Sequence, residues 1–135
     1  MVTLSHMGKL KENNQSKMGI LSIEKRKYPR YNVELPISYS RVDDKDLFGG
    51  MVANASEGGI LVYLPERMEL GAVLKVEIFY LRDLELGAIQ AIAKAVWSDL
   101  TIKGNFGEYR YGLEFQYIDE KDYNRLLALL KEIGN

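Results

Sequence analysis

The sequence contains no cysteine and only one histidine. The absence of cysteine excludes disulfide bonds, thiol catalysis and cysteine-ligated zinc or iron–sulfur sites. The histidine, His6, lies in a polar N-terminal region, and neither a GxxxxGK phosphate loop nor a paired-carboxylate motif is present. We therefore expect a protein that is not an enzyme and that has no metal site.

Long hydrophobic runs are also absent. No stretch approaches the roughly 18 uninterrupted apolar residues of a membrane helix, because even residues 73–81 include Lys75 and Glu77. Residues 1–23 carry lysines but no compact apolar region of the kind found in secretory signals. These features predict a cytoplasmic protein without membrane insertion.

The 135 residues, 47% of them hydrophobic and 27% charged, suit one globular domain. The net charge of -1 hides an asymmetry along the chain. Residues 1–31 hold seven basic and two acidic residues, a balance of +5, whereas the other 104 hold eleven basic and seventeen acidic residues, a balance of -6. Such a basic arm can attract an anionic ligand, or it can be a solvated tail.

Periodicity divides the chain into a flexible tail, residues 1–22, and a folded domain, residues 23–135. From Glu34 onward apolar residues alternate with polar ones, as in strands with one buried face. The expected strands are residues 34–40, 48–54, 60–64, 73–81, 88–98 and 108–118. After Asp119 the spacing becomes helical, with apolar residues at Tyr123, Leu126, Leu127, Leu130 and Ile133.

This order of elements predicts an all-β fold with one helix. Six consecutive antiparallel strands with short connections favour a closed or nearly closed barrel, because closure removes exposed strand edges. The C-terminal α-helix is expected to pack its leucines over the mouth or flank of the barrel. It could alternatively present those leucines to a partner protein.

The run Arg26-Lys27-Tyr28-Pro29-Arg30 is the first candidate for ligand binding. Its proline disfavours a helical conformation for Tyr28. In an extended chain the two arginines stand about 13 Å apart, and a turn at Pro29 would instead direct both to one phosphate or one guanine. Arginine suits either arrangement, because its planar fork binds phosphate or the O6 and N7 atoms of guanine bidentately.

The run Asn54-Ala55-Ser56-Glu57-Gly58-Gly59 joins two expected strands. Its composition is fully explained by turn chemistry, in which asparagine and serine bond to nearby backbone and glycine relieves strain. It also permits a second interpretation. Glycine lets a ligand approach the backbone, while Asn54 and Ser56 present polar atoms to a base.

Together, these two runs resemble the RxxxR and [D/N]xSxxG signatures of PilZ domains, bacterial receptors for cyclic di-GMP. Further segments fall in the family's order, among them Ala95-Val96-Trp97 and Tyr111-Gly112-Leu113-Glu114-Phe115. The resemblance implies a six-stranded antiparallel PilZ-type β-barrel whose N-terminal arm folds across the barrel face to trap the nucleotide.

The resemblance also implies individual roles for residues of both runs. Arg26 and Arg30 would hold phosphate and guanine, Asn54 and Ser56 a guanine edge, and Gly58 and Gly59 would leave room for the nucleotide. Many relatives have aspartate where this chain has Asn54, and some have a further arginine where it has Lys25. Trp97 is either ordinary barrel packing or a surface that stacks on guanine.

The expected function is a non-catalytic receptor for cyclic di-GMP, whose arm becomes ordered on binding and signals to a downstream protein. The alternative is a PilZ-fold adaptor that binds proteins and no nucleotide. Binding of a nucleic acid polymer is disfavoured, because the body of the chain is acidic and its strands lack an aromatic and basic pattern.

Overall fold

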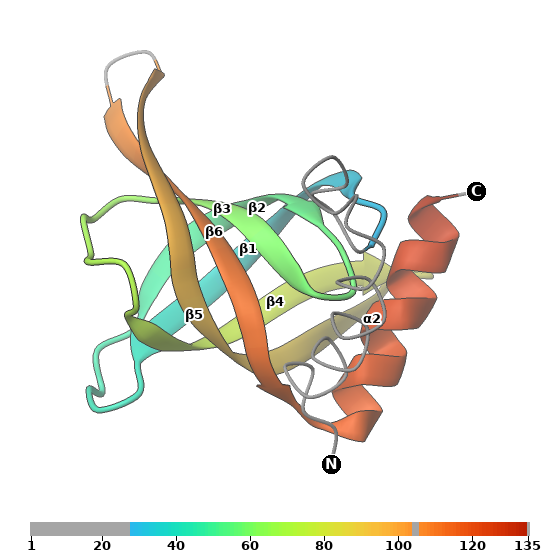
Figure 1. Cartoon of the computed structure of the whole chain (residues 1–135). Coiled ribbons are helices and arrows are strands. Elements are labelled where there is room, and N and C mark those ends of the chain that lie inside the picture. The colour runs from blue at the N-terminus through green and yellow to red at the C-terminus, as the bar shows by residue number, and fades with distance from the viewer. Residues whose placement is uncertain (1–27, 104–105, 135) are drawn as a thin grey trace, which may run out of the picture.

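The computed structural model describes residues 28–103 and 106–134 (Figure 1). The predicted tail, residues 1–22, lies outside this part of the chain, as do Lys25 and Arg26. The described elements, in chain order, are the strands β1 (Tyr31–Arg41), β2 (Phe48–Ala55), β3 (Gly59–Leu64), β4 (Val73–Arg82), β5 (Glu85–Lys103) and β6 (Phe106–Ile118), followed by the helix α2 (Glu120–Ile133).

The strands form one closed barrel in the order β1-β2-β3-β6-β5-β4, and every neighbouring pair is antiparallel. Closure is completed by β1, which pairs with β2 on one side and with β4 on the other. Helix α2 lies against one end of the barrel, as Figure 1 shows. The predicted all-β fold, a six-stranded antiparallel barrel with one C-terminal helix, is confirmed.

The interior of the barrel is filled by alternate residues of its strands. This packing confirms the core faces that period two predicts, because a side chain pointing inward recurs every second residue. Six such side chains of β3 and β4 are at most 3% exposed: Ile60, Val62, Leu64, Leu74, Val76 and Ile78. The barrel therefore has a packed core.

Helix α2 covers the barrel with a slightly different face from the one predicted. Tyr123, Leu126 and Leu130 are buried as expected, and Leu129 is buried as well. Ile133, which continues the helical spacing, lies in the last helical turn and is 37% exposed.

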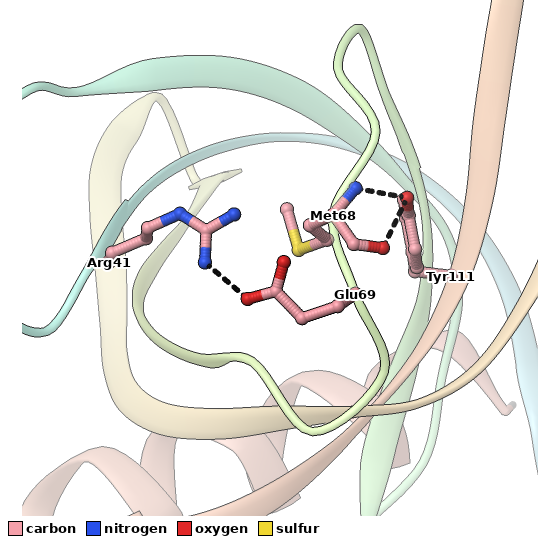
Figure 2. A network of polar contacts seen from close by, with 4 residues as sticks. All are labelled: Arg41, Met68, Glu69 and Tyr111. Carbon is pink, nitrogen blue, oxygen red and sulfur yellow. Dashed lines mark hydrogen bonds and ion pairs between the residues drawn. The ribbon is translucent and has the colours of Figure 1, made fainter.

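The loop between β3 and β4 lies at the end of the barrel away from α2 (Figure 1). Figure 2 shows how Tyr111 fixes this loop: its hydroxyl accepts a hydrogen bond from the N–H of Met68 at 2.7 Å and donates one to the Met68 carbonyl at 3.1 Å. Arg41 pairs with Glu69 at 3.0 Å beside them. Both ends of the barrel are thus covered, one by this loop and the other by the helix.

Candidate functional site

The turn between β2 and β3 is held together by Ser56. The Ser56 N–H donates to the Gly59 carbonyl at 2.9 Å. The Ser56 hydroxyl donates to the same carbonyl and accepts a hydrogen bond from the Gly58 N–H, both at 3.2 Å. The residue is only 8% exposed. Its hydroxyl therefore shapes the turn, with one lone pair of the oxygen left over.

The two glycines of the turn have different neighbours. A Cβ atom on Gly58 would lie 3.0 Å from Cδ2 of the Tyr28 ring, so the arm packs directly on this glycine. A Cβ atom on Gly59 would overlap the carbonyl oxygen of Leu113 in β6. Gly58 thus leaves room for Tyr28 of the N-terminal arm, the segment that precedes β1. Gly59 allows β3 and β6 to approach each other closely.

The described part of the arm runs from Tyr28 into β1 alongside the turn. Tyr31 pairs with Ala55 in the barrel register, and Pro29 and Arg30 are exposed to solvent. A cavity of about 240 Å³ separates the arm from the helix, lined by Pro29, Tyr31, Glu57, Leu127, Leu130 and Lys131. Arg30 lies between two of these lining residues in the sequence but does not itself line the cavity, and its side chain is exposed to solvent.

A hydrogen bond links the turn to the helix. The Tyr123 hydroxyl in the first turns of α2 donates to Glu57 Oε1 at 3.0 Å. Burial, together with this hydrogen bond and the nearby carboxylate charge, raises the pKa of Tyr123 well above its usual range. The phenol therefore stays protonated and keeps donating at all ordinary pH values.

A row of paired residues crosses the outer surface of the barrel next to the turn. Asn54 pairs with Asn32 on one side and with Leu61 on the other, Leu61 pairs with Gly112, and Gly112 pairs with Trp97. Directly paired residues of antiparallel strands point to the same face. Three strand spacings of about 4.8 Å put Asn54 and Trp97 roughly 14 Å apart on one face.

An irregularity in β2 sets this orientation of Asn54. The pairing of β2 with β3 shifts register between Val52 and Asn54, which leaves Ala53 as an extra residue. Val52 and Ala55 are both buried although they are three positions apart. A bulge of this kind re-aims the residues that follow it, so Asn54 lies on the outer face.

Trp97 is held flat on the outer surface. It is 43% exposed, so it is not part of the core. Its Cβ and Cε3 atoms lie 3.5 Å from the place a Cβ would take on Gly112, and the Arg110 guanidinium lies 5.3 Å from the ring centroid. Arg110 also pairs with Asp99 at 2.6 Å. The indole is therefore fixed in position while part of its surface remains open to a ligand.

Comparison with known families identifies the fold. Residues 24–132 match the sequence profile described as the PilZ domain. The chain belongs to the PilZ domain family. The matched range lies within the predicted folded domain, residues 23–135. A search of curated proteins found no match.

Solved structures of PilZ proteins share this fold at low sequence identity. The Bacillus subtilis inhibitor of motility (MotI/DgrA) aligns with a TM-score of 0.65 and 22% identity, over 77% of this chain and 48% of that one. The PilZ domain of YcgR from Escherichia coli, solved with c-di-GMP, aligns with a TM-score of 0.62 and 15% identity, over 81% and 91%. The chain spans about half the length of the motility inhibitor.

The PilZ barrel brings together some of the predicted site residues. Asn54 and Trp97 share one outer-face row, and Arg30 lies on the arm that packs on Gly58. Ser56 and Gly59 lie in the turn itself, where their contacts are with protein. Lys25 and Arg26 are outside the described residues.

Sequence reasoning missed the contacts that assemble this candidate site. Tyr28 lies inside the arginine run, but nothing in the run indicates that its ring packs on Gly58. The hydrogen bond between Tyr123 and Glu57 joins residues that are 66 positions apart. Arg110, which lies over Trp97, has the sequence pattern of an ordinary outward-facing strand residue. These contacts depend on how distant elements meet, so no local pattern reveals them.

The described residues offer few groups for other chemistry. Within 28–103 and 106–134, no three histidine, cysteine, aspartate or glutamate residues are grouped so that they could hold a metal ion. In the same part of the chain, no helix has the length and apolar character needed to cross a membrane.

Proposed function

We propose that this PilZ domain is a non-catalytic receptor that binds cyclic di-GMP on the outer face of its barrel. The observation that carries this proposal is the juxtaposition of the arm, the turn and the row from Asn54 to Trp97 on one surface. The roughly 14 Å row matches the scale of a dinucleotide. The YcgR relative, whose structure was solved with c-di-GMP, supports the choice of ligand.

The proposed roles follow from the chemistry of each side chain. Arg26 and Arg30 bind phosphate and guanine with their planar forks, and Lys25 adds positive charge only. Asn54 offers one acceptor oxygen and two donor hydrogens to a guanine edge. Trp97 presents its open surface to a guanine, where stacking contributes on the order of 1 to 3 kcal/mol.

Ser56, Gly58 and Gly59 act mainly through the shape of the turn. The Ser56 hydroxyl is occupied by Gly58 and Gly59, so it positions Asn54 and the turn backbone and has one lone pair for a ligand. Gly58 gives the arm a surface to pack on. Loss of either feature would displace the arm relative to Asn54.

Signalling would proceed through ordering of the arm over the barrel. Fixing about eight residues costs something like 8 to 16 kcal/mol of backbone entropy, which charge-assisted contacts and stacking must offset. The ordered arm then presents a new surface to a downstream protein. We also propose that this receptor is cytoplasmic.

Titration of the purified protein with cyclic di-GMP tests the proposal. Calorimetry is expected to give a saturable heat, and the fluorescence of Trp97, the only tryptophan, is expected to change over the same concentration range. Cyclic di-AMP is the matched control, because adenine lacks the O6 acceptor of guanine. Absence of heat at millimolar nucleotide would favour the alternative, a PilZ-fold adaptor that binds proteins alone.

A further inference from the structure

Three leucines project from the hairpin between β4 and β5. Leu81, Leu84 and Leu86 are 67%, 92% and 75% exposed. Leu81 and Leu86 are direct cross-strand partners, so their side chains lie next to each other on one face. We call these three residues the leucine tip. A cluster of exposed large apolar side chains marks an interaction site more often than scattered single ones do.

The backbone of the leucine tip shows that folding does not require a leucine at its apex. Asp83 and Leu84 have φ values of +52° and +68°, and they form the two-residue connection between Arg82 and Glu85. This turn geometry strongly favours glycine or asparagine. Leu84 therefore occupies an unfavourable backbone conformation and also exposes its side chain to water, and neither feature stabilises the barrel.

The charges around the leucine tip define what it can bind. Asp83 and Glu85 are exposed at its apex, and Arg82 is already paired with Glu132 of α2 at 2.9 Å. The tip is therefore an apolar surface with an acidic border. A complementary occupant carries apolar side chains flanked by cations.

A segment of this chain has that composition. Residues 17–27 contain the apolar residues Met18, Ile20, Leu21 and Ile23, with Lys17 before them and the basic run Lys25, Arg26 and Lys27 after them. Apolar side chains match the leucines, and the basic flanks match Asp83 and Glu85. The segment precedes the first described residue, Tyr28, and ends directly before it.

The point where the chain enters the described structure makes this docking geometrically possible. Tyr31 contacts the end of α2, because a Cβ on Gly134 would lie 2.9 Å from its ring. The same last turn of α2 holds the hairpin through Glu132 and Arg82. The apolar residues 18–23 precede Tyr28 by five to ten positions, so an extended chain between them and Tyr28 spans about 17 to 33 Å. This distance exceeds the width of a helix such as α2, about 10 Å, which contacts both Tyr31 and the hairpin.

We propose that residues 17–27 dock on the leucine tip of the same molecule. The docking covers the leucines with the segment's own apolar side chains and places its cations beside the acidic border. The docking involves no nucleotide and is tested without one, although Lys25 and Arg26 would have to leave the acidic border in order to bind cyclic di-GMP.

Crosslinking tests this inference, and the absence of native cysteine makes the experiment clean. Ser22→Cys and Leu84→Cys are introduced together and treated with a short bifunctional maleimide in nucleotide-free buffer. The apolar residues of the segment, Leu81 and Leu86 all remain in place. We expect an intramolecular crosslink, identified by mass spectrometry of the monomer band.

The matched control keeps both cysteines and removes the apolar partners. Leu81→Thr with Leu86→Thr should slow the crosslink about tenfold, because the cysteines are then joined only by a flexible tether. Ile20→Ser with Leu21→Ser should have the same effect, and it leaves the barrel unchanged. Equal rates in all variants, or a crosslinked dimer in place of the monomer, would overturn the inference.

Discussion

Arg30 is the one arginine of the RxxxR pair that the structure describes, and its exposed guanidinium lies on the arm that packs on Gly58. We predict that Arg30→Ala weakens cyclic di-GMP binding at least tenfold, since tenfold corresponds to about 1.4 kcal/mol, less than a charge-assisted contact contributes. Arg30→Lys should also weaken binding, because lysine keeps the charge and loses the planar fork. Calorimetry measures both variants.

Arg67 supplies the control for this prediction. It is an exposed arginine in the loop at the opposite end of the barrel, beside Met68. Arg67→Ala changes the net charge as Arg30→Ala does and should leave affinity almost unchanged. Equal losses in both alanine variants would mean that the charge of the chain, and not the position of Arg30, determines binding.

Gly58 and Gly59 are predicted to respond differently to the same substitution. Gly58→Ala places a methyl group against the Tyr28 ring, so it should weaken nucleotide binding while the unfolding free energy changes little. Gly59→Ala drives a methyl group into the Leu113 carbonyl and should cost about 1 to 3 kcal/mol of stability. Urea unfolding and calorimetric titration of both variants separate the two effects. Identical behaviour would contradict the division of roles.

Among the elements, the strands were predictable because burial on one face repeats every second residue. The pattern of β3 and β4 is uninterrupted, and their core faces follow directly from it. The bulge at Ala53 could not be predicted, because it is defined by the register of β2 against β3. The exposure of Ile133 could not be predicted for a similar reason: its spacing is helical, but burial depends on where the helix passes beyond the barrel.

The candidate site was predictable only as far as its two motifs. The sequence identifies Arg30 and Asn54 as polar groups suited to a nucleotide, and the barrel register adds that Asn54 faces outward in a row with Trp97. The contact of Tyr28 with Gly58 joins the motifs in space. Such contacts between distant segments depend on the closed barrel and leave no local signal.

The hairpin between β4 and β5 carries a prediction about stability. Leu84→Gly should raise the unfolding free energy by about 1 kcal/mol, because glycine adopts the positive φ of this turn without steric cost. Leu86→Gly, on the adjoining strand and also largely exposed, should lower it by about 0.5 to 1 kcal/mol. Urea unfolding of the two variants gives the comparison, and destabilisation by Leu84→Gly would contradict the prediction.

For the whole molecule, two buried tyrosines make stability depend on alkaline pH. Burial is the first cause that raises the pKa of Tyr39, and its hydrogen bond to Glu66 at 3.1 Å adds to the effect; Tyr123 behaves in the same way. In the unfolded chain both titrate near 10. Their stabilising effect is therefore complete below about pH 10 and is lost as the pH rises further.

Urea unfolding from pH 8 to 11 measures this dependence. We expect the unfolding free energy to fall above about pH 10, and the decline should be shallower in Tyr39→Phe, which removes one of the two phenols. Tyr80→Phe, which removes the hydroxyl of a partly buried tyrosine at another position in the barrel, is the control. An unfolding free energy that increases with alkaline pH would contradict the prediction.

The hydrogen bond from Tyr123 to Glu57 has a consequence for how a closed barrel could transmit a signal. A sheet closed on itself resists bending, so occupancy of its outer surface changes the barrel little. Glu57 belongs to the turn, and any rotation of that turn breaks or tightens its bond to the first turns of α2. Under the proposed receptor function, ligand binding would change the tilt of the helix, and a partner protein that contacts the helix would respond without touching the nucleotide.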